Sequence, residues 1–427
     1  MSVRAAMLRL LDYFPAILAR LGLVDRQKAT ESFDLAVPAM VTGGLRVLLR
    51  TADFLFVGIA VGDAGIAGLE LGFQYYFLGY GLSLAITSGT ISVVSRLQGA
   101  DERARADLAV KQSLWLAIVI SLPLTAVSWL YAEPLIGLLN DNPVVVGLGA
   151  GYLQVVMLSL VCRFWSMVAA RALAGSADTR TPMYVRLLTI PTNLVLNAVF
   201  VFGLGPAPRL GVVGAALGTT IANTLAAVTF FVLLASDRYA ISLPLRGKQF
   251  DLGIVTEIVR VSTPLTGMRL LQSTSRFPFL FILGNIGTGT AAVAAYAIGR
   301  RVMTFAMMPA WGYSTAASTL VGQALGAGEE DEANDYGWQT LRIALVTQLL
   351  VAVVIVVAAR PLATAFGTQH VDLAVDFIRV FGLVTAGFSI SRTMRGSRRG
   401  AGDTRWILYG TVLGSWAVRI SVAVLAL

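Results

Sequence analysis

The sequence predicts an all-α polytopic membrane protein made of two parallel repeats of six transmembrane helices. Of the 427 residues, 56% are hydrophobic and 13% are charged, whereas charged residues make up about a quarter of a typical soluble chain. The apolar stretches run for about 22 to 35 residues, and roughly 20 suffice for a helix to cross the hydrocarbon core. Motifs of the first half also recur in the second half at a nearly constant distance.

The hydropathy pattern predicts eleven spans. Their ranges are 36–61, 64–94, 108–132, 144–173, 182–204, 211–236, 253–285, 288–322, 338–358, 374–396 and 405–427. The first 30 residues hold five basic residues and two short apolar runs interrupted at Pro15. This pattern predicts an amphipathic segment on the membrane surface and not a cleaved signal peptide.

Three sequence features of the first half return in the second half. Pro38 matches Pro264 at an offset of 226, Gly99-Ala100 matches Gly326-Ala327 at 227, and Asp178-Thr179-Arg180 matches Asp403-Thr404-Arg405 at 225. Because six is an even number, both repeats enter the membrane from the same side, so they are parallel repeats.

We therefore divide the chain into four parts. They are an amphipathic segment over 1–30, an N-lobe with spans 1–6 over 31–236, a linker over 237–252, and a C-lobe with spans 7–11 over 253–427. The counterpart of span 6 would fall near residues 437–462, beyond Leu427. We expect eleven of twelve spans to be present, and prefer a shortened chain to a natural eleven-span protein as the reason.

The basic residues lie mostly on one side of the predicted spans. Of 33 lysines and arginines, 22 lie in the N-terminal segment or in and beside the loops after spans 2, 4, 6, 8 and 10, whereas Arg209 and Arg360 lie on the opposite side. The positive-inside rule then places the N-terminus in the cytoplasm. We expect a multi-pass protein of the cell membrane, with the net charge of +9 reflecting topology and not nucleic-acid binding.

Nine arginines are assigned to the interior of predicted spans, opposed by two embedded acids, Asp53 and Glu70. The nine are Arg46, Arg50, Arg163, Arg269, Arg276, Arg300, Arg301, Arg379 and Arg419. Each one taken singly is more readily a structural residue, because arginines near span ends can reach the interface. As a set they indicate a polar cavity between helices.

Asp53 is the lead candidate functional residue because it lies far from either end of span 1. A carboxylate in hydrocarbon is costly, so such residues usually face a bundle interior and often bind protons, ions or substrate. Glu70 lies near the outer end of span 2, and we interpret it as interfacial or structural. Cys162 and His370 are the only residues of their types, and neither metal-ligand spacing nor a catalytic cluster is found, so no enzyme is expected.

Several motifs together resemble the multidrug and toxic compound extrusion family, MATE. They are Leu35-Ala-Val-Pro38 with Asp53-Phe-Leu-Phe-Val-Gly58, Gly175-Ser-Ala-Asp-Thr-Arg-Thr-Pro182, Asn193-Leu-Val-Leu-Asn197, Gly211-Val-Val-Gly-Ala-Ala-Leu-Gly-Thr219 and Gly400-Ala-Gly-Asp-Thr-Arg405. The resemblance covers about residues 31–427. It implies two lobes around a V-shaped cavity that export amphipathic organic cations in exchange for protons or sodium, with Asp53 as the coupling residue and no prosthetic cofactor.

The positions of two asparagines agree with that implied role. Asp53 lies 17 residues into span 1 and Asn197 lies 15 into span 5, so at about 1.5 Å per residue both lie roughly 22 to 26 Å from the cytoplasmic end. Asn193 is four residues from Asn197 and faces the same way. Thr219, early in span 6, adds a candidate hydroxyl. We expect these four residues to form the cation-coupling site.

The chain departs from the family pattern at two places. Members of the archaeal type often carry an acid at the position of Asn197, and other members carry acids in spans 7 and 10, where the nearest match here in span 7 is Gln272. The chain therefore resembles the branch that relies on a single N-lobe aspartate.

Proton coupling is the preferred mechanism, because protonation removes the cost of a buried charge at Asp53. Sodium is the alternative ion, since Asp53, Asn193 and Asn197 offer oxygens suited to a hard cation. Arg46 and Arg50 lie on the helix face of Asp53 and could instead form an internal ion pair with it. The proposed substrate cavity adds a further set of residues, namely Tyr76, Tyr80, Gln272, Arg46, Arg50 and Arg276.

Two rival functions remain at this point. The first is a flippase of the same superfamily that moves anionic lipid-linked sugars or cell-wall precursors, favoured by the intramembrane arginines, since arginine pairs well with pyrophosphate. The second is a membrane scaffold, which would need no polar residues at mid-membrane. We expect the protein to act as a monomer in the lipid bilayer.

Overall fold

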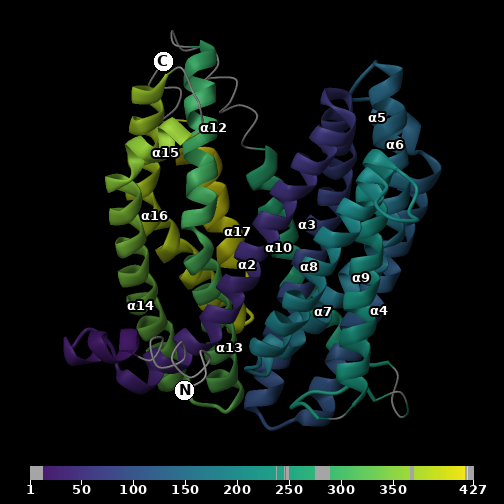
Figure 1. The fold of residues 1–427 in the computed structure, drawn as a ribbon. Coiled ribbons are helices and arrows are strands. Elements are labelled where there is room, and N and C mark those ends of the chain that lie inside the picture. The colour runs from purple at the N-terminus through teal and green to yellow at the C-terminus, as the bar shows by residue number, and fades with distance from the viewer. Residues whose placement is uncertain are drawn as a thin grey trace. The chain divides into compact units, whose positions relative to one another are not determined.

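A computed structural model describes residues 13–236, 238–244, 246, 250–274, 289–365, 370–418 and 421. Every regular element in these ranges is a helix (Figure 1). In the first half of the chain the helices are α2 (Arg26–Val61), α3 (Asp63–Gly99), α4 (Arg103–Leu130), α5 (Ala132–Gly137), α6 (Pro143–Leu158), α7 (Leu160–Gly175), α8 (Arg180–Phe202) and α9 (Gly211–Ala235). In the second half they are α10 (Leu252–Thr274), α12 (Gly289–Ala306), α13 (Met308–Gly326), α14 (Glu330–Val357), α15 (Ala359–Ala365), α16 (Val371–Gly400), α17 (Arg405–Val412) and the π-helix η1 (Leu413–Val418).

The helices group into two compact units. The N-lobe unit comprises Val41–Leu97 and Glu102–Arg260, and the C-lobe unit comprises the chain up to Met40, Gln98–Asp101 and Val261–Leu427. The borders between the units fall inside α2 and α10, so they differ from the repeat boundaries at residues 31 and 253. Those boundaries describe the duplicated sequence and stay a prediction.

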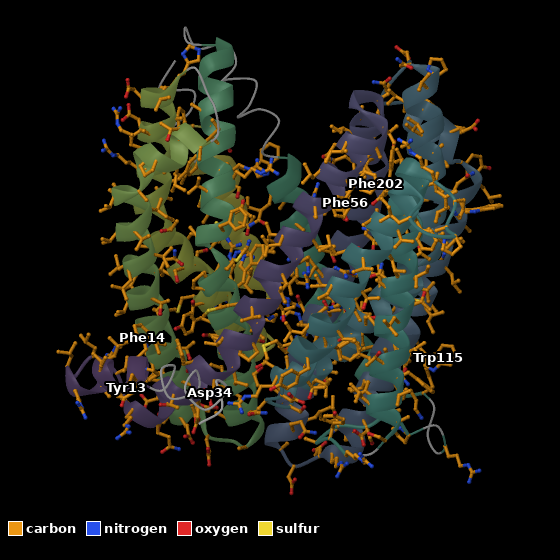
Figure 2. The ribbon with its side chains drawn as sticks, viewed as in Figure 1. Tyr13, Phe14, Asp34, Phe56, Trp115 and Phe202 are labelled. Carbon is orange, nitrogen blue, oxygen red and sulfur yellow. The ribbon has the colours of Figure 1, made fainter. Side chains whose placement is uncertain are left out.

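Length and composition make several of these helices membrane spans. Among the described residues, five helices are long and apolar enough to cross a membrane, and a sixth span results when α6 and α7 are counted together. α2 and α3 are longer still, at 36 and 37 residues, and carry Asp53, Arg50 and Glu70. Large apolar side chains also point away from the protein, as Trp115 on α4 does (Figure 2). The protein is thus an all-helical, polytopic membrane protein.

The predicted span 4 is broken in the structure. It consists of α6 and α7, which meet at Ser159 with a bend of 48°. The start of α6 is fixed by Asn142, whose side chain accepts hydrogen bonds from the N–H groups of Val144 and Val145, and by Pro143 at the first helical position, where a missing N–H is harmless. The break itself carries no proline or glycine, so the apolar run predicted a single helix.

Helix α8 positions the two asparagines, and its ends are fixed by local chemistry. The Asp178 carboxylate accepts a 2.9 Å hydrogen bond from the Thr181 N–H in the first turn, which satisfies one of the N–H groups left free at the start of a helix. At the other end, Gly203 adopts a left-handed conformation with φ of 72°, as glycine commonly does after a helix. Arg209 then donates to the Ala60 carbonyl at 2.7 Å and ties the following loop to the end of α2.

Glycine allows α8 and α9 to pack closely. A Cβ atom on Gly214 would lie 2.4 Å from the Phe200 carbonyl oxygen, and one on Gly218 would lie 2.1 Å from the Asn197 side-chain oxygen. Small residues spaced four apart bring membrane helices into backbone contact. The close approach places α9 directly behind the asparagines of α8.

The N-terminal segment belongs to the C-lobe unit. Leu18, Val24 and Phe33 are buried in a cluster with Tyr313 of α13 and Ile343 of α14. Residues 13–20 are helical, with Tyr13 exposed and Phe14 stacked against the Phe33 ring at 5.5 Å (Figure 2). The amphipathic segment over residues 1–30 stays a prediction.

Candidate functional site

The candidate site is built around Asp53 on α2 and two asparagines on α8. The side-chain nitrogen of Asn197 donates to Oδ1 of Asp53 at 2.6 Å and to Oδ1 of Asn193 at 2.8 Å. Asn193 and Asn197 are both buried, whereas Asp53 is partly exposed. The spacing of four residues on one helix face therefore brings three of the four predicted coupling residues into one hydrogen-bonded chain.

Apolar packing holds the two helices together beside this chain. The Phe56 ring of α2 meets the Phe202 ring of α8 edge-on at 5.7 Å between centroids (Figure 2). Phe56 lies three residues after Asp53, so it follows the acid by about one helical turn. The aromatic contact and the hydrogen bond fix the same pair of helices.

The oxygen of the Asn197 amide is a buried atom without a hydrogen-bond partner. It faces Gly218 of α9, where a Cβ atom would lie within 2.1 Å of it. A buried polar atom left unpaired costs about 1 to 3 kcal/mol. The missing side chain at Gly218 is thus what lets Asn197 turn its amide nitrogen toward both Asp53 and Asn193.

Thr219, the fourth predicted coupling residue, follows Gly218 on α9. Its side chain is half-buried, and in the part of the chain that the structure describes no hydrogen bond joins it to Asp53. The neighbouring Thr220 instead donates to the Val155 carbonyl at 2.9 Å. The structure therefore assembles Asp53, Asn193 and Asn197, with Thr219 beside them.

Arg50 is engaged by partners other than Asp53. Its guanidinium group lies 3.5 Å from a carboxylate oxygen of Glu70 on α3 and stacks over the Phe73 ring at 3.8 Å. Within the described residues, no ion pair joins Asp53 to Arg46 or Arg50, although the charges of Arg50 and Asp53 interact at longer range. Within the described residues, Arg50 therefore does not form the ion pair with Asp53 that was considered from the sequence. Glu70 gains a role as its partner.

A second polar network lies in the same unit. Asn223 of α9 donates to the Tyr76 hydroxyl at 3.2 Å and to the Ser159 hydroxyl at 3.1 Å. Tyr76 and Asn223 are buried, with Tyr152 of α6 buried as well. Tyr76 is thus part of a buried, hydrogen-bonded group of polar side chains. The sequence predicted Tyr76 but not Asn223 or Ser159.

The structure gives less information about the remaining predicted cavity residues. Arg46 is half-buried on α2, and Gln272 is half-buried on α10 of the C-lobe unit. The side chain of Tyr80 and the whole of Arg276 lie outside the described residues. These residues are therefore not brought into the Asp53 site by the described structure.

Two oxygens at the site converge on a single amide nitrogen. Asp53 and Asn193 each direct an oxygen at the Asn197 amide nitrogen, whereas a hard cation prefers several oxygens directed at one point. Among the described residues no group of three histidine, cysteine or acidic side chains could hold a metal.

Two features of this site were missed by sequence reasoning. Gly218 could have been identified from its spacing of four after Gly214, a pattern that marks close helix contact. The ion pair between Arg50 and Glu70 could not have been identified. It joins α2 and α3, and the sequence does not give the rotation of one helix relative to the other.

Comparison with characterised proteins agrees with this architecture. The chain is 28% identical over 397 residues to the probable multidrug resistance protein NorM of Thermotoga maritima, covering 92% of this chain and 84% of that protein. It is 24% identical over 357 residues to the FAD transporter of Shewanella oneidensis, covering 82% and 77%.

Solved structures share the fold. A MATE structure in the straight conformation aligns with a TM-score of 0.85 at 21% identity, covering 92% of this chain and 87% of that chain. A MOP superfamily transporter from Pyrococcus furiosus, described as having a binding pocket of reverse polarity, aligns with a TM-score of 0.85 at 21% identity, covering 93% and 88%.

The family profile matches the chain twice. The MatE profile covers residues 38–199 and again residues 264–425, and the two matches begin 226 residues apart, the offset that relates Pro38 to Pro264. The duplication and the two-lobe architecture predicted from the sequence are therefore confirmed. The chain belongs to the MatE family.

Proposed function

We propose that the protein is a secondary active antiporter that exports amphipathic organic cations in exchange for protons. Asp53 is the coupling residue, as in the branch of the family with a single N-lobe aspartate. Asn193 and Asn197 orient it, and Thr219 lies beside them. The protein works as a monomer in the cell membrane with its N-terminus in the cytoplasm.

The observation that carries this proposal is that Asp53, inside a predicted membrane span, forms no ion pair with any residue that the structure describes. Asp53 is held by the Asn197 amide, while Arg50, the nearest candidate counter-charge, is occupied by Glu70 and Phe73. An intramembrane acid is costly to keep charged and commonly marks an ion or proton pathway. Its negative charge is available to a proton or to an organic cation, though not to both.

Exchange follows from that competition. When the site opens to the acidic exterior, a proton binds Asp53 and removes the charge that attracts a cation, so the substrate leaves. When it opens to the cytoplasm, the proton is lost and the carboxylate again attracts a cation. Movement of the two lobes alternates this access, as a rocking mechanism of parallel repeats requires.

The relatives support this assignment at the level of drug export. The protein of Thermotoga maritima is named a probable multidrug resistance protein, and a solved neighbour is a multidrug resistance MATE family transporter in an outward-facing conformation.

The test is uptake of a fluorescent organic cation into inside-out membrane vesicles. We expect an imposed pH gradient, and not a sodium gradient, to drive uptake in the wild type. Asp53→Asn keeps the side-chain size and removes the ionisable group, so it should abolish gradient-driven uptake. Asp141→Asn is the matched control, since it makes the same substitution at an exposed acid of the N-lobe unit and should retain uptake.

Two results would contradict the proposal. A sodium gradient that drives uptake by itself would replace the proton as coupling ion. Uptake that is the same in Asp53→Asn and in the wild type would remove Asp53 from the mechanism.

A further inference from the structure

A group of four arginines lies within the C-lobe unit. Arg392, Arg395 and Arg399 follow one another at spacings of three and four on α16, which places them along one face of that helix. Arg269 of α10 lies close enough for its charge to interact with those of Arg392 and Arg395. We call these four residues the arginine cluster.

The surroundings of the cluster are polar on one side and aromatic on the other. Arg399 donates to the Ser318 hydroxyl at 3.1 Å and to the Ser314 carbonyl at 2.9 Å, both on α13. Among the described residues, Arg395 donates a hydrogen bond only to the Met268 sulfur, at 3.6 Å, which is a weak acceptor. Arg399 is therefore bound firmly, whereas Arg395 keeps most of its donors for another partner.

Arg392 lies against aromatic rings. Its guanidinium carbon is 4.9 Å from the Phe388 ring centre and 5.9 Å from that of Trp311 on α13. Its Nε is a buried atom without a hydrogen-bond partner. The Trp311 side chain is 38% exposed, so part of this aromatic side chain is accessible next to the Arg392 guanidinium group.

Within the described residues, neither Arg392 nor Arg395 forms an ion pair, and the four like charges repel one another. Two positive charges without an acidic partner are costly within a membrane-spanning bundle. The geometry therefore calls for an anion that is not part of this chain.

A phosphate group suits this arrangement. Guanidinium groups bind phosphate in a forked geometry that uses two N–H donors at once, and several can share its oxygens. An aromatic ring attached to the phosphate would lie against the exposed part of Trp311. We propose that the arginine cluster binds the phosphate group of an amphipathic ligand, with Arg392 and Arg395 as the main contacts and Trp311 as the stacking surface.

This inference does not depend on coupling through Asp53. It extends the ligands of the protein from organic cations to organic phosphates, which either a soluble aromatic phosphate or a lipid headgroup could supply. The chemistry of the site is the same for both sources.

The test measures equilibrium binding to the full chain in phosphatidylcholine nanodiscs. The probes are 1-naphthyl phosphate and 1-naphthylmethylammonium, which carry opposite charges on the same ring system. We expect the phosphate to bind more tightly than the amine. Arg392→Gln and Arg395→Gln should each weaken phosphate binding by about 10-fold or more, as expected for a hydrogen bond between charged groups.

The control variant is Arg360→Gln. Arg360 forms an exposed ion pair with Asp372 at 2.7 Å, so its loss changes the net charge equally without touching the cluster. Arg395→Lys, which keeps the charge but not the forked donor group, should give an intermediate loss. If Arg395→Gln fails to fold, Arg395→Lys still tests whether the forked donor group of Arg395 binds the phosphate.

A further arm identifies the source of the phosphate. Nanodiscs with one fifth phosphatidylglycerol should weaken binding of 1-naphthyl phosphate if the cluster takes lipid headgroups, and should leave it unchanged if the ligand is soluble. The proposal is overturned if the two probes bind equally, if wild-type protein binds no 1-naphthyl phosphate in phosphatidylcholine, or if Arg360→Gln weakens binding as much as the variants of the cluster. Because no ion gradient is used, failure here is distinct from failure of proton coupling.

Discussion

The two polar regions of this protein carry opposite charges on equivalent scaffolds. In the N-lobe unit a single carboxylate, Asp53, is held by an asparagine amide. In the C-lobe unit four arginines meet, and within the described residues Arg392 and Arg395 have no acidic partner. One region suits a cation or a proton, whereas the other suits an anion.

The duplicated sequence shows that this contrast lies in side chains and not in packing. At the offset of 225 that aligns the Asp-Thr-Arg loops, Arg392 corresponds to Met167 and Arg395 to Ala170. The packing glycines are shared, however. Gly175 contacts Ile91 and Val94 of α3, and its counterpart Gly400 contacts Ser318 and Gly322 of α13. Duplication preserved the helix contacts, while the polar residues diverged to give each lobe its own chemistry.

The largest effect is expected from filling the space behind the N-lobe asparagines. Gly218→Val would place atoms within 2.1 Å of the Asn197 side chain and 2.9 Å of its backbone nitrogen, so α9 would move away from α8. Overpacking of this kind costs about 1 to 3 kcal/mol. We expect a lower unfolding midpoint and loss of transport.

The matched control for that substitution is Gly147→Ala on α6, where an added Cβ meets no atom within 4 Å. Thermal unfolding in detergent and vesicle uptake are the readouts. Equal behaviour of the two variants would show that the close approach of α8 and α9 is not needed for the Asp53 site.

Removing the amide donor should affect function more than stability. Asn197→Leu keeps the size of the side chain and takes away both hydrogen bonds of the amide nitrogen, so Asp53 loses its positioning partner. Loss of a hydrogen bond to a charged group costs about 1.5 to 3 kcal/mol, and we expect transport to fall by about 10-fold or more.

A double-variant cycle checks that prediction. Asn197→Leu should cause no further loss of uptake in the Asp53→Asn background, because its effect passes through Asp53. Independent, additive losses would place Asn197 in a different role.

The Arg50 pair with Glu70 should contribute little. Both side chains are about two-fifths exposed, at 44% and 40%, and exposed ion pairs contribute at most about 1 kcal/mol. We expect Glu70→Gln to leave the unfolding midpoint nearly unchanged and to retain pH-driven uptake. A loss of coupling as severe as that of Asp53→Asn would mean that the functional acid was assigned wrongly.

The smallest effect is expected in the acidic first turn of α14, which lies outside the predicted membrane spans. This turn shows how carboxylates behave in water. A hydrogen bond with Glu329, together with partial desolvation and the Glu329 charge, raises the pKa of Glu332, while Lys28 opposes the shift and Asp335 adds to it. Because the pKa is raised in the folded state, the contribution to stability is present below the unfolded pKa and is lost as pH rises through the folded pKa.

We therefore expect the first turn of α14 to open more readily at pH 7 than at pH 4. Hydrogen exchange, expressed as protection factors to remove the intrinsic effect of pH, measures this opening. Glu332→Gln should reduce the difference between the two pH values, whereas Glu330→Gln should retain more of it. An undiminished difference in Glu332→Gln would assign the effect to another group.

The sequence predicted most of the architecture and part of the site. Membrane helices follow from apolar length, and the repeat follows from constant offsets, since neither depends on how helices are rotated. The common helix face of Asn193 and Asn197 was also predicted, as was the shared depth of Asn197 and Asp53, because spacing and depth can be read from the sequence. Each of these properties can be read along the chain without knowing how the helices pack.

The features that the sequence did not predict depend on how the helices are rotated and on the spaces between them. Sequence position groups Arg392 and Arg395 with the basic residues beyond span 10, because both lie within four residues of its predicted end. Only the packing of α10, α13 and α16 brings them to Arg269 and Trp311. The space at Gly218 and the bend at Ser159 likewise arise from contacts between helices.

The most direct test of the central claim is proton release from the purified protein. A cation known to be transported is added to the protein in weakly buffered detergent solution with a pH indicator. If proton and substrate compete for Asp53, binding of the cation releases a proton from the wild type and none from Asp53→Asn. Release that persists in Asp53→Asn, or cation binding to the wild type that releases no proton at any pH between 5 and 8, would contradict the account.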